Sequence, residues 1–455
     1  MRPVPNRQRS LSMNSTGISA QDKWEKIGEI LDACPTITVL VFNDLTTHPD
    51  GTPKKNTGAP GMDATMVLRF AIVMFIEQLS YRMLYERVAD SIILRDFCGI
   101  PFGLLPSFST LQDNIKKLRP ATLEEINSII VKYAVEKGVE DGNDVRMDTT
   151  GVETNIHTPT DASLLWDVIR VLTHVLFECE CQFPQLHGLF QNHLVAAKTL
   201  LYKINNEQKK DIKKNLYAKL IKIARKVVAY ARIALERLGL FDPLTAEQMI
   251  AQIELTAKLE HLLPMADTII DQAFRRVLKE ENVPVDEKVF SIFQPHTDIL
   301  VKGKRDPVFG HKILLSAGKN IILDCDVFLG NPADANLYVP ALKSVEALLE
   351  QVPPNVATDG GFASKNNAQT AIDMGVINVA FSSPKGSKIV QTITESGTYK
   401  RLCKWRAGIE GIISALKRAF GLRRCSWSGY QSFQAYVHCA VLAFNLQQIA
   451  RALLA

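Results

Sequence analysis

Hydrophobic residues recur at helical spacing in the first third of the chain, which predicts a small all-helical region. From residue 64 to residue 100 apolar side chains return every three or four positions, and residues 106–138 add two more helices. Candidate N-caps for these two helices are Ser107, Ser109 and Thr122. Short helices with tight connections form either a helix-turn-helix DNA reader or a plain bundle, and the pattern leaves both interpretations open.

Strand-like patterns begin near residue 144 and are separated by a long helical stretch. The run DVRMDTT predicts a first strand with Asp148 at its end, whereas residues 164–281 return to helical spacing. After residue 284 a period of two predicts strands in KVFSIFQPHTDILVKG, GHKILLSAG, NIILDCDVFLGN, NVATD and VINVAFSS, with helices between the last three and over residues 400–455. We therefore expect an α/β fold in which a large helical insertion interrupts a mixed sheet.

These patterns divide the chain into three parts. Residues 1–143 form an N-terminal arm and a helical domain, residues 144–163 and 282–455 form the sheet domain, and residues 164–281 form the insertion. A length of 455 residues agrees with this division, because one hydrophobic core rarely serves so long a chain.

Composition predicts a folded protein of the cell interior. Hydrophobic residues make up 46% of the chain and charged residues 22%, which excludes wholesale disorder. The most apolar stretch, residues 66–79, is too short to span a membrane and carries Arg69 and Glu77. The start of the chain has no apolar signal core and the eight cysteines form no CxxC pair, so we expect reduced thiols and no export.

A net charge of +5 does not identify a partner, but one segment is strongly basic. Between residues 203 and 237 many lysines and arginines, Lys213 and Lys214 among them, accompany only three acidic residues. Such a segment is either a solvated helix face or an arm that contacts DNA phosphates and adds salt-sensitive affinity.

Two acidic residues lie at the ends of predicted strands. Asp148 and Asp359 are each followed by small or polar residues that leave room for a ligand, and strand ends are where side chains converge in an open α/β sheet. The run Asp359, Gly360, Gly361 is also typical of an ordinary turn, so this position alone decides little.

A third acid lies on the polar side of a predicted amphipathic helix. Arg406, Glu410 and Lys417 share that side, opposite a stripe of Ile409, Ile412, Ile413, Leu416 and Phe420. An Arg and a Glu four residues apart usually form only a surface ion pair. With the two aspartates, however, Glu410 completes a carboxylate set suited to two magnesium ions about 4 Å apart, which catalyse phosphoryl transfer. Arg406 and Lys417 would then neutralise phosphates.

The chain resembles the DDE transposases of bacterial insertion sequences, specifically the ISNCY group. The resemblance covers nearly all of residues 62–455. It is carried by VRMDTTGVETNIHTPTDASLLWD, QPHTDILVKGKRDPVFGHK, GNPADANLYVPAL, ATDGGFASKNN and RAGIEGIISALKRAFGLRRCSWSG, with LSYRMLYERVADSIILRDFCGI and PSFSTLQDNIKKL similar to the family's N-terminal helical domain. It implies a ribonuclease-H-like catalytic domain, preceded by a helical DNA-binding domain.

The resemblance also implies the chemistry. Asp148, Asp359 and Glu410 would be the catalytic and metal-binding triad, with two Mg²⁺ ions that Mn²⁺ can replace. The family has a Tyr near the glutamate where this chain has Cys403, although Tyr399 lies one helical turn earlier. The protein would bind the terminal inverted repeats of its element, cut the strands and transfer them into target DNA. It would work as a homodimer or higher oligomer, with the nucleoid in a prokaryotic cytoplasm and away from membranes.

Two other functions stay open beside this one. The chain could be a transposase-derived DNA-binding protein whose catalysis has lapsed, although the presence of all three acids argues against that. It could also be a stand-alone metal-dependent nuclease, which would not need a helical domain for end recognition.

Further residues are candidates for DNA contact. Lys312 begins a predicted strand and either lines a substrate or lies in a solvated turn. Arg423 and Arg424 follow the glutamate helix, and Trp427 beside them is a candidate for stacking on DNA. We expect Trp166 and the apolar terminal helix to lie in the core.

The remaining polar residues after the first strand have more ordinary interpretations. We expect a structural hydrogen bond for His157, and Asp161 and Asp167 to lie at the start of the inserted helix. Glu153 is close enough in sequence to approach the metals, but no pattern requires it.

Overall fold

The computed structural model describes residues 19–48, 50–55, 61–100, 105–301 and 306–455, which form two compact units. Unit 1 comprises Met1–Asn155 and Gly310–Ala455, and unit 2 comprises Ile156–Phe309. The helices expected before residue 144 and the strands after residue 309 thus share one unit. The predicted three-part division stays a prediction, since a compact unit is not the same as a functional domain.

The N-terminal half of unit 1 is helical. Its helices are α1 (Ser19–Ala33), α2 (Thr36–Thr46), α3 (Ala64–Ile76), α4 (Tyr81–Ala89), α5 (Ile92–Phe97), α6 (Phe108–Ile115) and α7 (Pro120–Glu136). Ser107 caps α6 by accepting the backbone N–H of Thr110, as predicted. Ser109 lies inside α6, and Thr122 lies inside α7, where its hydroxyl donates to buried Asp44 of α2 at 2.9 Å.

A mixed sheet forms the centre of unit 1. Its strands are β1 (Asp144–Glu153), β3 (Val308–Ala317), β4 (Ile322–Phe328), β5 (Asn355–Asp359) and β6 (Asn378–Ser382). Within unit 1 the order is β4, β3, β1, β5, β6, in which β3 is antiparallel to β4 and β1 while β5 is parallel to β1 and β6. The predicted α/β fold with a mixed sheet is therefore confirmed.

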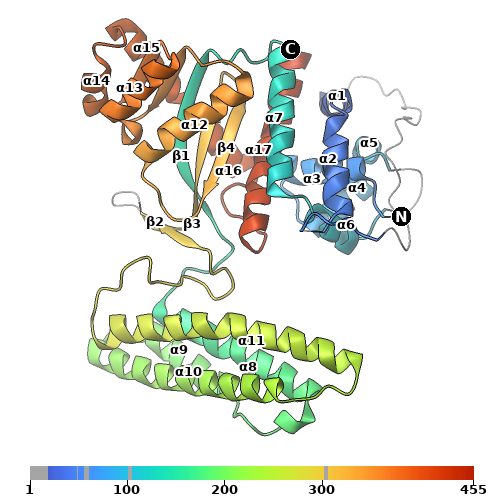
Figure 1. Ribbon diagram of the computed structural model, residues 1–455, viewed down its shortest axis with the longest axis vertical. Helices are drawn as coiled ribbons and strands as arrows, with labels where there is room; N and C mark the ends of the chain where they lie inside the picture. Colours follow the sequence, from blue (N-terminus) through green and yellow to red (C-terminus); the bar gives the residue numbers. More distant parts are fainter. Residues whose placement is uncertain (1–18, 49, 56–60, 101–104, 302–305) are drawn as a thin grey trace. The chain divides into compact units, whose positions relative to one another are not determined.

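Six helices of unit 1 complete the sheet region. They are α12 (Asp334–Leu349), α13 (Lys365–Met374), α14 (Pro384–Val390), α15 (Ser396–Arg406), α16 (Gly408–Ala419) and α17 (Tyr430–Leu454). Figure 1 shows α12 lying across the strands. Strand alternation separates two faces: Phe381 packs edge-on against Tyr338 of α12, whereas its neighbour Ala380 packs with Ala357 against Leu402 of α15.

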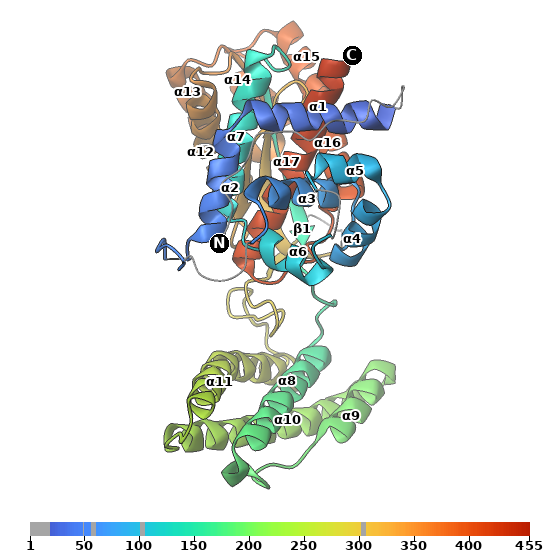
Figure 2. The same cartoon turned by 90° about the vertical axis from the view of Figure 1, so that its right-hand side faces the viewer.

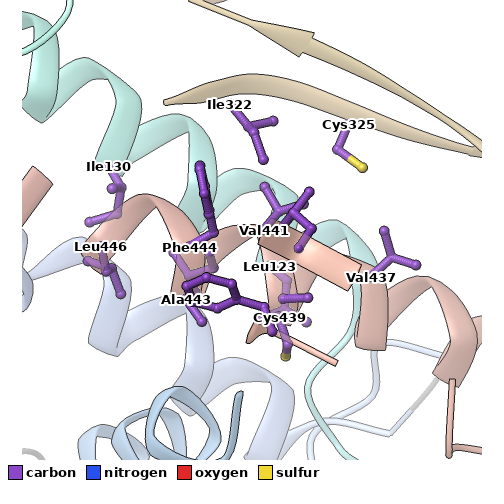
Figure 3. Packing of buried hydrophobic residues seen from close by; sticks show 14 of the residues in the cluster. Leu123, Ile130, Ile322, Cys325, Val437, Cys439, Val441, Ala443, Phe444 and Leu446 are labelled. Carbon is purple, nitrogen blue, oxygen red and sulfur yellow. The ribbon is translucent and has the colours of Figure 1, made fainter. Parts of the chain in front are cut away.

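Helix α17 is the centre of the unit 1 core. Its side chains meet those of α7 and β4, as Figure 3 shows for Leu123, Ile130, Ile322, Cys325, Val437, Val441, Phe444 and Leu446. Helices α1 and α3 also contact α17, so the N-terminal helices and the sheet share one core. Among the described helices α17 is long and apolar enough to cross a membrane, but 67% of that window is buried, as expected for a core helix.

Buried polar groups fix the edge of this core. Asn445 of α17 accepts the backbone N–H of Ile322 at 2.8 Å, donates to the carbonyl of Ile322 at 2.7 Å, and donates to Asn127 Oδ1 of α7 at 2.8 Å. The edge strand β4, the helix α7 and α17 are thus joined by one fully buried amide.

Unit 2 is built mainly from helices. They are α8 (Asp161–Gln182), α9 (Leu194–Asn206), α10 (Lys210–Gly239) and α11 (Ala246–Ala273), with the short strand β2 (Asp298–Leu300) near its end. Figures 1 and 2 show α8, α10 and α11 side by side, around a core of their own.

One strand prediction is wrong for most of its length. Over its described residues, 288–301, the run KVFSIFQPHTDILVKG forms a strand only at β2. The hydroxyl of Ser291 accepts the backbone N–H groups of Phe293 and Gln294, and this local turn replaces the expected extended backbone.

Candidate active site

Asp148 and Asp359 occupy equivalent positions on neighbouring parallel strands. The first strand does not end at Asp148 as predicted, because its pairing with β3 continues to Glu153. Its pairing with β5 ends at Met147 and Thr358, and each aspartate follows directly. Because parallel strands lie about 4.8 Å apart and side chains alternate between faces, both carboxylates lie on the same face of the sheet. This is the face that α15 covers.

Backbone N–H groups orient both carboxylates. The N–H of Thr149 donates to Asp148 Oδ1 at 2.7 Å, and the N–H of Gly361 donates to Asp359 Oδ1 at 2.8 Å. Asp359 thereby caps the short 3-10 turn Gly360–Phe362, so the turn interpretation of this motif is also correct. Asp148 is buried and Asp359 is half-buried.

The predicted helix around Glu410 is two helices that meet at Ala407. Arg406 ends α15 and Glu410 lies in the first turn of α16. The guanidinium of Arg406 nevertheless joins the acids: its Nη2 lies 3.8 Å from Asp148 Oδ2 and 3.3 Å from Glu410 Oε1. Arg406 is 12% exposed and Glu410 is 70% exposed, so the glutamate side chain is open to solvent beside a nearly buried guanidinium.

Burial of the apolar stripe fixes which side of α16 faces outward. Ile409, Ile412 and Leu416 are buried against the unit 1 core, with Phe420 just beyond the helix. Lys417 lies two turns after Glu410 and is half-buried. The stripe predicted from the sequence is therefore confirmed.

Arg146 is a site residue that the sequence did not reveal. It lies two positions before Asp148 on β1, and its Nη1 donates to the carbonyl of Trp405 at 3.0 Å. Its guanidinium also lies 4.6 Å from the centre of the Trp405 ring, and burial lowers its pKa. Arg146 thus holds the end of α15 against β1.

Tyr399 supports the neighbouring strand. Its hydroxyl donates to the carbonyl of Phe381 at 2.7 Å, which fixes α15 at the end of β6. Burial raises the pKa of this hydroxyl. The aromatic residue therefore contributes to packing from one helical turn before Cys403.

Lys312 is buried against protein acceptors. Its ammonium donates to the carbonyl of Pro332 at 2.7 Å and to Asp334 Oδ1 at 2.9 Å. Thr149 also donates to Asp334 Oδ1, at 3.1 Å. Asp334 is a second site residue that the sequence did not reveal, because it reads as an ordinary residue at a helix start.

The candidates for DNA contact after α16 differ in exposure. Arg423 and Arg424 are exposed, and Arg424 Nε lies 3.8 Å from Glu153 Oε2. Trp427 is only 4% exposed and packs edge-on against Phe75 and Tyr436. Its ring has no surface to offer a base, so we correct its assignment to a core residue.

The other acids of the stretch after β1 have structural partners in unit 2. Asp167 is buried, and its Oδ2 lies 3.4 Å from His157 Nε2 while its Oδ1 accepts from Arg170 at 3.0 Å. Asp161 pairs with Arg276 at 2.9 Å, directly after the N-cap Thr160 of α8.

The basic face of α10 is partly compensated within unit 2. Glu280 Oε1 lies 3.0 Å from Lys210 Nζ and 3.5 Å from Lys214 Nζ. Lys213, which is half-buried, forms no ion pair with the residues that the structure describes. Lys210 and Lys214 are thus partly neutralised within unit 2, whereas Lys213 keeps its charge available for either interpretation, a solvated face or a DNA-contacting arm.

The carboxylates suit a hard divalent cation. Across the described ranges, no three His, Cys, Asp or Glu side chains lie close enough to hold one metal ion together. Magnesium, however, is usually bound by one or two carboxylates together with substrate phosphates and water. The in-register pair Asp148 and Asp359 supplies two such carboxylates.

Comparison with protein families gives two matches. Residues 283–446 match the family model described as the transposase DDE domain, and residues 16–117 match that of a transposase domain (DUF772). The first match contains Asp359 and Glu410, and the second contains α3 to α6. No curated protein and no solved structure gives a significant match.

Proposed function

Because the chain belongs to the DDE transposases of insertion sequences, we propose that it cuts the ends of its own element and joins them to target DNA. Asp148, Asp359 and Glu410 are the proposed triad. Two observations support this proposal: Asp148 and Asp359 follow paired residues of neighbouring parallel strands, and Arg406 contacts both Asp148 and Glu410. Assignment to the ISNCY group stays a prediction.

The proposed catalytic core has a ribonuclease-H-like arrangement. Three antiparallel strands, β4, β3 and β1, continue into the parallel strands β5 and β6, and this order supports the proposal. In this arrangement unit 2 is an insertion between the first and second strands of the core.

The proposed reaction has two phosphoryl transfers. Water attacks the phosphodiester at each element end and releases a 3′-OH, which then attacks a phosphodiester of the target and displaces its 3′-oxygen. Two Mg²⁺ ions, or Mn²⁺ in their place, would supply activation of the attacking oxygen and stabilise the leaving one. Asp148 and Asp359 would hold them, while Arg406 orients Glu410 and offers positive charge to the scissile phosphate.

Recognition of the element ends is proposed for α3 and α4. The two helices meet at 103° across a four-residue link, in which Gln78 has a left-handed φ of 52°. Angles of this size and short turns are typical of the helix-turn-helix motif. Helix α3 is almost wholly buried, whereas α4 exposes Arg82 and Tyr85, which suits a helix placed in the major groove.

The working form is proposed to be a homodimer or higher oligomer in the cytoplasm, because both ends must be held during transfer. A stand-alone nuclease is less consistent with the match of residues 16–117 to a transposase domain. Deleting residues 1–143 is a poor test between these functions, since it would uncover α17. Substitutions at the surface of α4 leave the core intact.

Cleavage of a duplex that carries the DNA bordering the gene tests this function. Asp148→Asn, Asp359→Asn and Glu410→Gln should each abolish Mg²⁺-dependent cleavage and leave duplex binding within about twofold of wild type. Glu153→Gln is the matched control. The Glu153 carboxylate faces Arg424, so this variant should cleave normally. Near wild-type cleavage by any of the three triad variants would refute the triad.

A further inference from the structure

Asp334 is a fourth carboxylate near the positions on β1 and β5 that carry Asp148 and Asp359. It is the first residue of α12, and its side chain is 17% exposed. Thr149, which directly follows Asp148, donates to Asp334 Oδ1 at 3.1 Å. A residue 185 positions away in the chain thus holds the backbone next to the first catalytic aspartate.

Asp334 also lies against the turn that follows Asp359. A β-carbon added at Gly361 would lie 2.9 Å from Asp334 Oδ2 and 3.1 Å from Asp359 Oδ1, so the two carboxylates are near neighbours across this glycine. The N–H of the same glycine donates to Asp359 Oδ1. Asp334 therefore lies directly beside the turn that orients Asp359 and occupies the space that a side chain at position 361 would need.

The charge of Asp334 is compensated by a buried cation. Lys312 Nζ lies 2.9 Å from Asp334 Oδ1, and the two side chains are 9% and 17% exposed. An uncompensated carboxylate here would repel the carboxylates of Asp148 and Asp359. With Lys312 beside it, Asp334 serves as a hydrogen-bond acceptor without adding net negative charge.

We propose that Asp334 is a positioning residue for the triad: it accepts the hydrogen bond of Thr149 and lies beside Gly361, so that it fixes the backbone next to Asp148 and Asp359, and Lys312 neutralises its charge. This inference rests on the proposed function for its catalytic consequence. Its structural consequence is independent of activity, because the spacing of the two aspartates also sets their affinity for a divalent cation.

Thr149→Val isolates the hydrogen bond. It keeps the β-branched shape and leaves the ion pair of Lys312 and Asp334 in place. We expect a loss of tenfold or more in kcat for end cleavage and a several-fold weaker binding of Mn²⁺, with duplex affinity within twofold of wild type. Thr149→Ser retains the hydroxyl and should restore both quantities to within twofold.

The double variant Lys312→Met with Asp334→Ala removes the pair without leaving a buried unpaired charge. It should reproduce both losses while remaining folded by circular dichroism. Mn²⁺ binding is measured by electron paramagnetic resonance with the duplex present, and the site is identified as the binding that Asp148→Asn abolishes. The proposal would be overturned if wild-type protein showed no such Mn²⁺ binding. It would also be overturned if Thr149→Val and the double variant were both folded and bound Mn²⁺ with wild-type affinity.

The two proposals fail in different ways. Wild-type protein that binds Mn²⁺ at Asp148 but cuts no element end would refute the proposed function. In that case the Mn²⁺ affinities of Thr149→Val and Thr149→Ser would still decide the role of Asp334.

Discussion

Arg146 and Trp405 join the first strand to the helix that precedes Glu410. The guanidinium donates to the Trp405 carbonyl at 3.0 Å and lies over its ring at 4.6 Å. Arg406, the next residue, contacts both Asp148 and Glu410. The position of Glu410, the proposed catalytic glutamate, therefore depends on the contact between Arg146 and Trp405.

Arg146→Met should uncouple Glu410 from Asp148. Loss of a buried charge-assisted hydrogen bond should lower the free energy of unfolding by about 2 kcal/mol and reduce kcat for end cleavage by about tenfold. Urea denaturation and single-turnover cleavage measure the two effects. Arg401→Met is the control, since this exposed arginine of α15 pairs only loosely with Asp144 at 3.4 Å. Equal kcat values for the two variants would contradict this role of Arg146.

Much of the fold was predictable, because strands and amphipathic helices repeat at short spacing. The end of β5 at Asp359 and the apolar stripe of α16 follow from local pattern alone, whereas β1 continues past its expected end at Asp148 to Glu153 through its pairing with β3. Arg146 and Asp334 could not be found in this way, since their partners lie 259 and 185 positions away. The DNA-contact prediction for Trp427 was wrong because Phe75, which belongs to the distant N-terminal helix α3, packs against its ring in the shared core.

Arg82 tests the proposed recognition helix. It is exposed near the start of α4, with its guanidinium 5.0 Å from the ring centre of Phe108. Arg82→Ala should weaken binding of the element end by about 1–3 kcal/mol while leaving binding to unrelated duplex almost unchanged. Fluorescence anisotropy with both duplexes measures the difference. Lys132 is an exposed lysine of α7, and Lys132→Ala should leave both affinities unchanged. An equal loss of affinity for both duplexes in Arg82→Ala would contradict a role of α4 in specificity.

Lys213 and Lys214 separate the two interpretations of the basic helix. If α10 contacts DNA phosphates, Lys213→Ala should lower affinity for every sequence and reduce the salt slope by about one. Lys214→Ala should have a smaller effect, because Glu280 already lies 3.5 Å from its ammonium. Binding is titrated over a series of salt concentrations. Identical slopes for wild type and Lys213→Ala would support the solvated face.

Asp324 should make stability depend on pH. Burial, followed by the nearby charge of Asp326, raises the pKa of this carboxyl to about 7. Between about pH 4 and pH 7 the folded state keeps a proton that the unfolded state has released, so stability falls as the pH rises through this range. In wild type the free energy of unfolding should fall by an amount on the order of 3 kcal/mol over this range, and Asp324→Asn should remove that decrease. Chemical denaturation from pH 5 to pH 8 measures it, and parallel curves for the two proteins would exclude Asp324 as the source.

Strand transfer measures most directly whether the protein is a DDE transposase. A duplex with the element end already cut to a free 3′-OH is incubated with wild-type protein, supercoiled plasmid and Mg²⁺ or Mn²⁺. We expect covalently joined DNA for wild type and Glu153→Gln, and none for Asp359→Asn. Joined DNA from Asp359→Asn, or hydrolysis by the wild type without any joining, would contradict this expectation.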